Sequence, residues 1–210
     1  MKNTIFKILI LLLLLFCFTF VSAYSYAQNV LSNISSEVFR LHIIANSDSY
    51  EDQHLKYLVR DKLLSYMNTI CADVSSKAEA INLAYLHIDD FEKIAQNVIV
   101  ENGFNYPVNI TIEKTNFPTK NYGDISLPAG IYDALNVKIG TASGHNWWCV
   151  MFPPLCFVDV SAGIVPDESK EALSSSLEEE SYNLISSDDM VFKFKIVEIL
   201  QNLKLKSTHK

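Results

Sequence analysis

Two adjacent tryptophans, Trp147 and Trp148, place the strongest constraint on how this chain can fold, and the chain has no others. They lie in the run Gly144–Phe157, beside a histidine, two cysteines and a Pro-Pro step. Each indole buries a large apolar area, and neighbouring side chains of an extended strand point to opposite faces of a sheet. The pair therefore predicts a sheet in which one tryptophan fills a core, while the other covers a second layer or meets a partner.

Upstream of this run, the sequence predicts a strand and then an amphipathic helix. Residues 38–45 alternate as a strand does, and the two faces are formed by Phe39, Leu41 and Ile43 and by Arg40, His42 and Ile44. Ser49 would cap the helix, with Asp52 as its capping-box partner. The helix has an apolar stripe at Leu55, Leu58, Val59, Leu63, Tyr66, Met67 and Ile70, and a polar face at Asp52, Lys56, Arg60 and Asp61.

A second amphipathic helix is expected to begin at Ser75 or Ser76, where Glu79 completes a capping box, and to end at Asn102-Gly103. After Gly103 the hydrophobic period becomes that of strands. Strands are predicted around 108–112, 135–139 and 147–152, with a loop at 114–123 and a turn at 127–130. These segments suggest an antiparallel meander.

The C-terminal third is less regular. Residues 166–180, rich in serine and acid, fit either a short exposed helix or a mobile segment with little buried surface. Residues 190–196 alternate as a one-sided strand that would rejoin the sheet. The predicted class is α+β, with two amphipathic helices packed on a mostly antiparallel sheet and preceded by an N-terminal signal or anchor helix.

The N-terminus predicts export. Lys2 and Lys7 flank an uncharged apolar run, residues 8–21, which has the length of a signal h-region and falls short of the ~20 residues of a spanning helix. Small residues before Ala23 and Ala27 fit a cleavage site, but a slightly longer run would span, so cleavage and anchoring both stay open. The predicted divisions are a signal peptide or anchor over 1–27, a single domain over 28–202 and a basic tail over 203–210.

The charge balance excludes one class of partner. The formal net charge is −7, and removal of residues 1–27, which hold two lysines and no acid, would shift it to about −9. No basic patch with interleaved aromatic residues occurs, so nucleic-acid binding is not expected. The basic cluster Lys204, Lys206 and Lys210 is expected to be a solvated end that touches an anionic membrane at most weakly.

Four polar residues converge at the end of the predicted first strand: Arg40, His42, Asn46 and Asp48. One interpretation is a functional site. The alternative, which we favour, is that Arg40 pairs with a carboxylate while Asn46 and Asp48 shape the turn through side-chain-to-backbone bonds.

His145 and Cys149 suggest a Cys–His nucleophile pair, but a spacing of four on a strand separates them by about 13 Å. The pair could form only if the segment before Trp147 folds back. Cys149 and Cys156 flank the Pro-Pro bend, and either a disulfide or two reduced, buried thiols is compatible with the sequence. No paired ligand spacing, glycine-rich phosphate loop or protease motif is present, so no metal, cofactor or catalytic residue is expected.

Two segments carry a resemblance to a known family. The first is Arg40-Leu-His-Ile-Ile-Ala-Asn-Ser-Asp-Ser49 with Glu51-Asp-Gln53 and Val59-Arg-Asp61. The second combines Phe117-Pro-Thr-Lys120, Leu127-Pro-Ala-Gly130 and His145-Asn-Trp-Trp-Cys-Val-Met-Phe-Pro-Pro-Leu-Cys-Phe157. Over about residues 38–160, and again at 192–198, the chain resembles stage II sporulation protein R, with Met151 as a small departure.

The resemblance implies a non-enzymatic signal of endospore-forming bacteria. Such a protein is exported from the forespore to the space between the septal membranes, where it activates a membrane-bound aspartic protease, stage II sporulation protein GA, that processes the sigma-E precursor. The N-terminal segment, if uncleaved, would hold it in the septal membrane. The expected partner-binding residues are Arg40, His42, Asn46, Asp48, His145, Asn146, Trp147 and Trp148. The alternative is an exported envelope hydrolase that uses Cys149 and His145.

Overall fold

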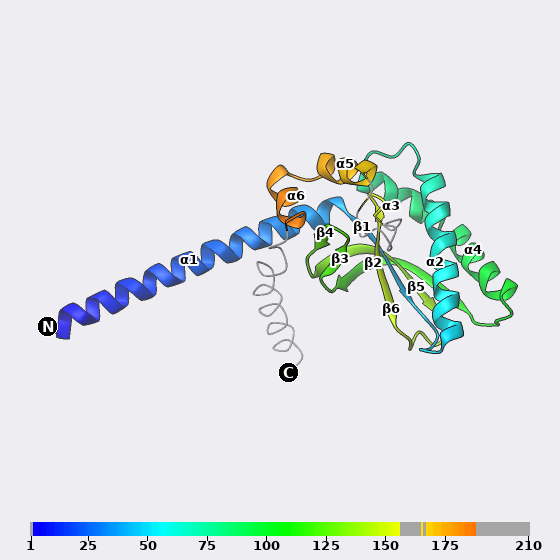
Figure 1. Cartoon of the computed structure of the whole chain (residues 1–210), viewed down its shortest axis with the longest axis horizontal. Coiled ribbons are helices and arrows are strands. Elements are labelled where there is room, and N and C mark those ends of the chain that lie inside the picture. Colours follow the sequence, from blue (N-terminus) through cyan, green and yellow to red (C-terminus); the bar gives the residue numbers. More distant parts are fainter. Residues whose placement is uncertain (1, 156–164, 166, 188–210) are drawn as a thin grey trace.

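A four-stranded sheet forms the centre of the folded part, in a computed structural model that describes residues 2–155, 165 and 167–187. Its strands are β1 (Phe39–Ile44), β2 (Val108–Phe117), β5 (Gly130–Ile139) and β6 (Asn146–Phe152), in the order β2-β5-β1-β6. A separate hairpin joins β3 (Lys120–Tyr122) to β4 (Ile125–Leu127). The predicted α+β class, with a mostly antiparallel sheet, is confirmed (Figure 1).

The expected meander is wrong, because β1 inserts between β5 and β6 and runs parallel to β5. Its burial explains the position: five of the six residues of β1 are buried, and a strand that is apolar on one face and covered on the other belongs in the middle of a sheet. The predicted loop at 114–123 is also wrong. β2 continues to Phe117 and pairs with β5 along its whole length, and β3 occupies Lys120–Tyr122.

Helices α2 (Tyr50–Ile70), α3 (Lys77–Leu86) and α4 (Ile88–Glu101) cover one face of the sheet. Ser49 and Ser76 cap α2 and α3 as predicted, by accepting hydrogen bonds from the backbone N–H groups of Asp52 and Glu79. The single helix expected between Ser76 and Asn102 is instead broken at His87. Its backbone leaves the helical region, and its ring contacts Asp90 and Tyr66, so α4 takes a new direction against α2.

The other face is covered by the β3–β4 hairpin, by α5 (Asp167–Ser176) and α6 (Glu179–Ile185), and by the end of α1 (Lys2–Glu37). The two clusters of buried apolar residues therefore lie on opposite sides of one sheet. Of the two alternatives for 166–180, a short exposed helix or a mobile segment, the structure shows helix at 167–176 and again from 179, but the expected exposure is wrong in part, because Leu173 and Leu177 are buried. The predicted strand at 190–196 and the basic tail at 203–210 lie outside the described residues.

Helix α1 has an exposed first part and a last part that is buried in the fold. Its first part, from Ile5 to Val21, is exposed and apolar, and α1 is the one helix of the described chain that is long and apolar enough to cross a membrane. Its last turns bury Ala27, Val30, Leu31 and Ile34 against the sheet. The helix runs without interruption through the predicted boundary at residue 27 (Figure 1).

Candidate functional site

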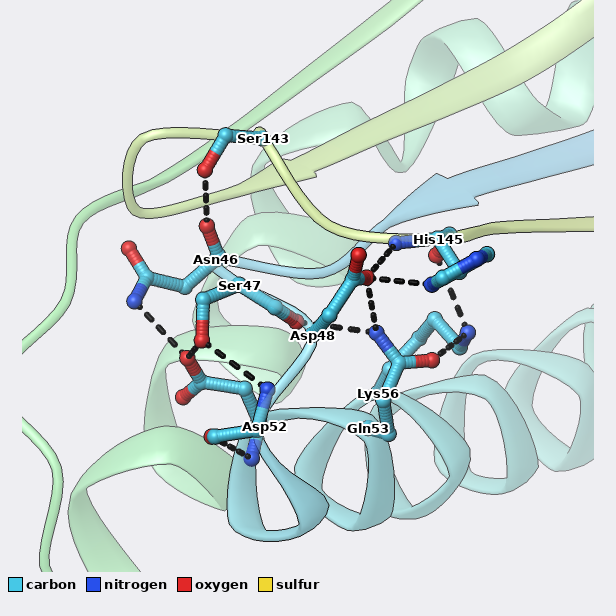
Figure 2. A network of polar contacts seen from close by, with 9 residues as sticks. Asn46, Ser47, Asp48, Asp52, Gln53, Lys56, Ser143 and His145 are labelled. Atoms are coloured by element: carbon cyan, nitrogen blue, oxygen red, sulfur yellow. Dashed lines mark hydrogen bonds and ion pairs between the residues drawn. The ribbon is translucent and has the colours of Figure 1, made fainter.

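The candidate site lies where β1 ends, α2 begins and the loop from β5 enters β6. Asn46 ties these elements together. Its side-chain amide donates to Asp52 Oδ2 at 2.9 Å, and its Oδ1 accepts from the backbone N–H of Thr141 at 2.9 Å. The hydroxyl of Ser143 donates to the carbonyl of Asn46 at 2.7 Å. The Asn46 side chain thus joins the β1–α2 loop to α2 and to the loop before β6, through contacts that reach beyond its own turn (Figure 2).

Asp52 is buried at the centre of this network, although the sequence placed it on the solvent face of α2. Burial by itself raises the pKa of Asp52, but hydrogen bonds from Ser47, Asn46, Tyr106 and Ser49 outweigh burial and hold the pKa below its ordinary value. The capping box is only half formed: the backbone N–H of Asp52 donates to Ser49 Oγ, but the backbone N–H of Ser49 donates to Ser47 Oγ and not to the Asp52 carboxylate.

Asp48 and His145 form the exposed edge of the site. Asp48 Oδ1 accepts a hydrogen bond from the backbone N–H of His145 at 2.6 Å and also contacts His145 Nδ1 (Figure 2). The side chain of His145 remains 77% exposed. The backbone carbonyl of His145 accepts a hydrogen bond from Lys56 Nζ at 3.0 Å. Helix α2 and the β1–α2 loop thus fix the backbone that leads into β6 while leaving the imidazole at the surface.

Lys56 was also expected on the solvent face of α2, but it is 1% exposed. Its ammonium group donates to two neutral acceptors, Gln53 Oε1 at 2.6 Å and the carbonyl of His145. Burial lowers the pKa of Lys56, the neighbouring Arg60 lowers it further, and Asp48 opposes both. No carboxylate of the described residues forms an ion pair with this ammonium group.

Arg40 and His42 do not lie on the surface. Arg40 is fully buried, and its guanidinium carbon lies 4.0 Å from the ring centre of Phe117. It donates to the carbonyl of Cys149 and to the hydroxyl of Tyr122. The prediction that Arg40 pairs with a carboxylate is therefore wrong within the described chain. Its guanidinium group contacts aromatic rings and neutral oxygens instead.

His42 is buried and contacts two of the predicted partner-binding residues, Trp148 and Asn146. Its ring stacks on Trp148 with centroids 3.8 Å apart, and its two ring nitrogens lie 3.0 Å from Asn136 Oδ1 and 2.8 Å from Asn146 Oδ1. Asn146 is exposed, whereas His42 is buried. His42 therefore positions Trp148 and Asn146, and any part that it has in a contact is indirect.

The prediction that the two tryptophans face opposite layers is confirmed. Trp147 packs against the core beneath the helices, and Trp148 packs against the core beneath the hairpin. Arg60 lies over the Trp147 ring at 4.5 Å, and Tyr57 meets it edge-on at 5.4 Å. Both indoles are partly buried, so each contributes to a core and to the surface.

A groove of about 650 Å³ crosses β6 between α2 and β3. Helix α2 contributes Lys56, Tyr57 and Arg60 to its wall, β3 contributes Lys120 and Tyr122, and its floor is formed by residues 145–149. No aspartate or glutamate is among the described residues that line it. Of the predicted partner-binding residues, His145, Asn146, Trp147 and Trp148 line the groove, and Asp48 contacts His145 beside it.

The structure gives no support to a Cys–His hydrolase. Cys149 is buried and disulfide-bonded, so its sulfur carries no thiolate, while His145 is engaged with Asp48. The predicted partner, Cys156, lies outside the described residues, and the pairing stays a prediction. Within the described ranges, no three His, Cys, Asp or Glu side chains gather as a metal site requires.

Sequence reasoning missed Tyr57, Arg60, Lys120 and Tyr122 as parts of this surface. Arg60 follows Lys56 by four residues and Tyr57 by three, a helical spacing that could have placed Arg60 beside each of them on α2. Lys120 and Tyr122 carried no such signal, because their segment was taken for a loop. They reach β6 only through the folding of the hairpin.

Comparison with known proteins identifies relatives. A family model described as Stage II sporulation protein R matches residues 35–162, which is more than half of the chain. Stage II sporulation protein R of Bacillus subtilis (strain 168) is 39% identical over 147 residues, which cover 69% of this chain and 66% of that protein. The match thus spans just under two thirds of the relative's own length. No solved structure matches the chain.

Proposed function

Because this chain belongs to the stage II sporulation protein R family, we propose that its role in sporulation is to activate a membrane-bound aspartic protease, stage II sporulation protein GA, which then processes the sigma-E precursor. The protein acts by binding, without making or breaking a covalent bond. Activation requires that it bind the active arrangement of the protease more tightly than the inactive one, because a ligand shifts an equilibrium only by differential affinity.

Helix α1 supports the proposed location, which is the space between the two septal membranes after export from the forespore. An apolar N-terminal helix fits a signal sequence or an anchor. The last turns of that helix belong to the core, so a chain cleaved near Ala23 keeps its buried residues. The proposed activator is compatible with either fate of the N-terminus.

The observation that carries the proposal is the exposed pair His145 and Asn146 on a rigid support. Asp48 holds the backbone of His145, and His42, which stacks on Trp148, contacts the side chain of Asn146. A surface that is ordered before it binds loses less conformational entropy on binding. Aromatic residues at the centre of such a surface concentrate binding energy. We propose this end of β6 as the contact with the protease.

The test is co-expression of the full chain with the protease and the sigma-E precursor in a host that lacks the pathway, with cleavage of the precursor measured on immunoblots. The double variant His145→Ala/Asn146→Ala is expected to lose at least about tenfold of the stimulated cleavage, because it removes both contact side chains. Its free energy of unfolding should fall by only about 1 kcal/mol, since His42 loses one hydrogen-bond partner.

The matched control is His54→Ala/Asn109→Ala, which removes the same side-chain types from exposed positions outside the groove lining. It should stimulate cleavage as the unmodified chain does. Full stimulation by His145→Ala/Asn146→Ala would exclude this end of β6 as the contact. Absence of cleavage with the unmodified chain, when all three proteins are present and folded, would contradict the proposed function itself.

A further inference from the structure

The groove over β6 concentrates positive charge on an acidic protein. The chain carries a formal net charge of −7, yet Lys56, Arg60 and Lys120 line one groove without any lining aspartate or glutamate among the described residues. Asp61, which pairs with Arg60, and Asp48, which contacts His145, are both exposed, and ion pairs at the surface contribute little. The groove thus keeps an attraction for negative charge.

Lys56 makes that attraction specific. Its ammonium group is buried in the wall of the groove and donates only to neutral oxygens, so its charge is not balanced by a direct partner among the described residues. A buried cation gains most from a carboxylate that is brought to it with water excluded. Lys120, on the opposite wall, also forms no ion pair within the described part of the chain.

Aromatic side chains give the groove an apolar part beside its cations. Tyr57 and Trp147 line the groove together, and the buried Trp147 Nε1 has no hydrogen-bond partner within the described residues. Arg60 covers one face of Trp147 and His42 covers one face of Trp148, so the groove offers donors and ring edges more than open ring faces. This chemistry favours a peptide over a sugar that stacks flat on a ring.

We propose that the groove binds an extended acidic segment of the receptor, with carboxylates that meet Lys56, Arg60 and Lys120 and a backbone that runs along Trp147. The combination of Tyr, Trp and Arg with complementary charge is typical of protein-binding surfaces. The inference rests on the proposed function for the identity of the receptor. The chemistry of the bound segment follows from the groove alone.

Binding can be measured directly, because both tryptophans of the chain line the groove and report on it by fluorescence. The full chain in detergent micelles is titrated with a capped ten-residue peptide that alternates glutamate and alanine. A saturable change in tryptophan emission is expected, and the peptide in which glutamine replaces glutamate should give none. The variant Arg60→Glu/Lys120→Glu should raise the dissociation constant by about tenfold or more, because both cations become repulsive.

The matched control is Lys62→Glu/Lys138→Glu, which makes the same change of net charge at exposed positions outside the groove. Its dissociation constant should stay within about twofold of the unmodified chain. If Arg60→Glu/Lys120→Glu does not give the far-ultraviolet circular dichroism of the folded chain, Arg60→Gln/Lys120→Gln replaces it. That variant removes charge without adding repulsion and should still weaken binding.

The co-expression assay separates this inference from the proposed function. If the unmodified chain and Lys62→Glu/Lys138→Glu stimulate cleavage and Arg60→Glu/Lys120→Glu does not, the groove is the receptor site. Equal stimulation by both variants overturns the inference and leaves the proposed function standing. If the unmodified chain stimulates no cleavage, the proposed function fails, and the titration alone decides on the groove. The inference that the groove binds an acidic peptide is overturned if the acidic peptide gives no change in emission. It is also overturned if soluble peptidoglycan fragments saturate the groove in its place.

Discussion

At the scale of single residues, Asn46 and Asp52 hold together three elements that are distant in sequence. Asn46 joins the β1–α2 loop to Thr141, and Asp52 anchors that loop to α2. A buried carboxylate is stabilising only when its hydrogen-bond partners are in place, since an unpaired one costs more than the bonds contribute. These two side chains therefore determine whether the surface at His145 and Asn146 is ordered.

Asp52→Asn is expected to lower the free energy of unfolding at pH 7 by about 1–3 kcal/mol, because it removes the charge that accepts these hydrogen bonds. The pKa of Asp52 is lowered in the folded state, so its contribution is complete above its unfolded pKa of about 3.9 and is lost as the pH falls through the folded pKa. The difference between variant and unmodified chain should therefore shrink below about pH 4.

Urea unfolding at pH 7 and at pH 3 measures this difference. The control, Asp73→Asn, changes an exposed carboxyl on the turn after α2 and should leave the stability within about 0.5 kcal/mol. An equal loss for Asp52→Asn at both pH values would show that the side chain acts through its shape, and that its charge is not needed.

Gly140 leaves the space that the Asn46 side chain occupies in this network. It adopts φ +58°, and an added Cβ would lie 2.2 Å from Asn46 Oδ1, whereas Gly103 adopts φ +83° with open space around it. Gly140→Ala and Gly103→Ala should both lose about 1–2 kcal/mol to the left-handed backbone. Only Gly140→Ala should lose more, through displacement of Asn46, and urea unfolding of both variants tests this order. Equal losses would mean that Asn46 moves aside freely.

At the scale of elements, α1 is both an apolar N-terminal segment and a part of the core. Its exposed first half has no contact that the fold requires, while Val30, Leu31 and Ile34 pack between β5 and the α5–α6 pair. Leu31 lies so close to Gly130 that a side chain at that position would collide with it. Glycine thus lets β5 begin here without a shift of the Leu31 side chain.

Two substitutions of the same type on α1 separate these roles. Ile34→Ala should lower the free energy of unfolding by about 2–5 kcal/mol, because it leaves a cavity in a fully buried position. Ile8→Ala, at a position that is 52% exposed, should leave it within about 0.5 kcal/mol. Urea unfolding of both variants of the full chain in detergent micelles measures the difference. A small effect of Ile34→Ala would place the end of α1 outside the cooperative core.

At the scale of the whole molecule, one sheet separates two cores that depend on each other. Phe91 lies in the core under the helices and Phe117 in the core under the hairpin. Because β2, β5 and β6 each contribute residues to both cores, neither core can form unless the sheet is in place. The groove lies over β6, at the edge of the same sheet. The proposed contact surface therefore forms only when both cores are folded.

Unfolding of the folded part is therefore expected to be a single transition. Phe91→Ala and Phe117→Ala should each lower the free energy of unfolding by about 3–5 kcal/mol. In both variants, tryptophan fluorescence and far-ultraviolet circular dichroism should give the same midpoint. Ile131→Ala, which changes an exposed side chain on β5, is the control. Separate midpoints for the two probes would show that the cores unfold independently.

The sequence by itself determined the features that depend on local periodicity. Alternation placed Phe39 and Arg40 on opposite faces of β1 and Trp147 and Trp148 on opposite faces of β6. Capping serines located the starts of α2 and α3, and the apolar run located the helix that could enter a membrane. Each of these signals lies within a few residues of the feature that it predicts.

Only the tertiary structure decided which elements become neighbours. The insertion of β1 between β5 and β6, the burial of Lys56 and Asp52, and the groove between α2 and β3 all arise from long-range pairing. Arg40, for example, meets Tyr122 and Cys149 across more than 80 residues of sequence. Local periodicity specifies which face of an element is apolar, but the partner that covers this face is selected by the packing of the whole chain.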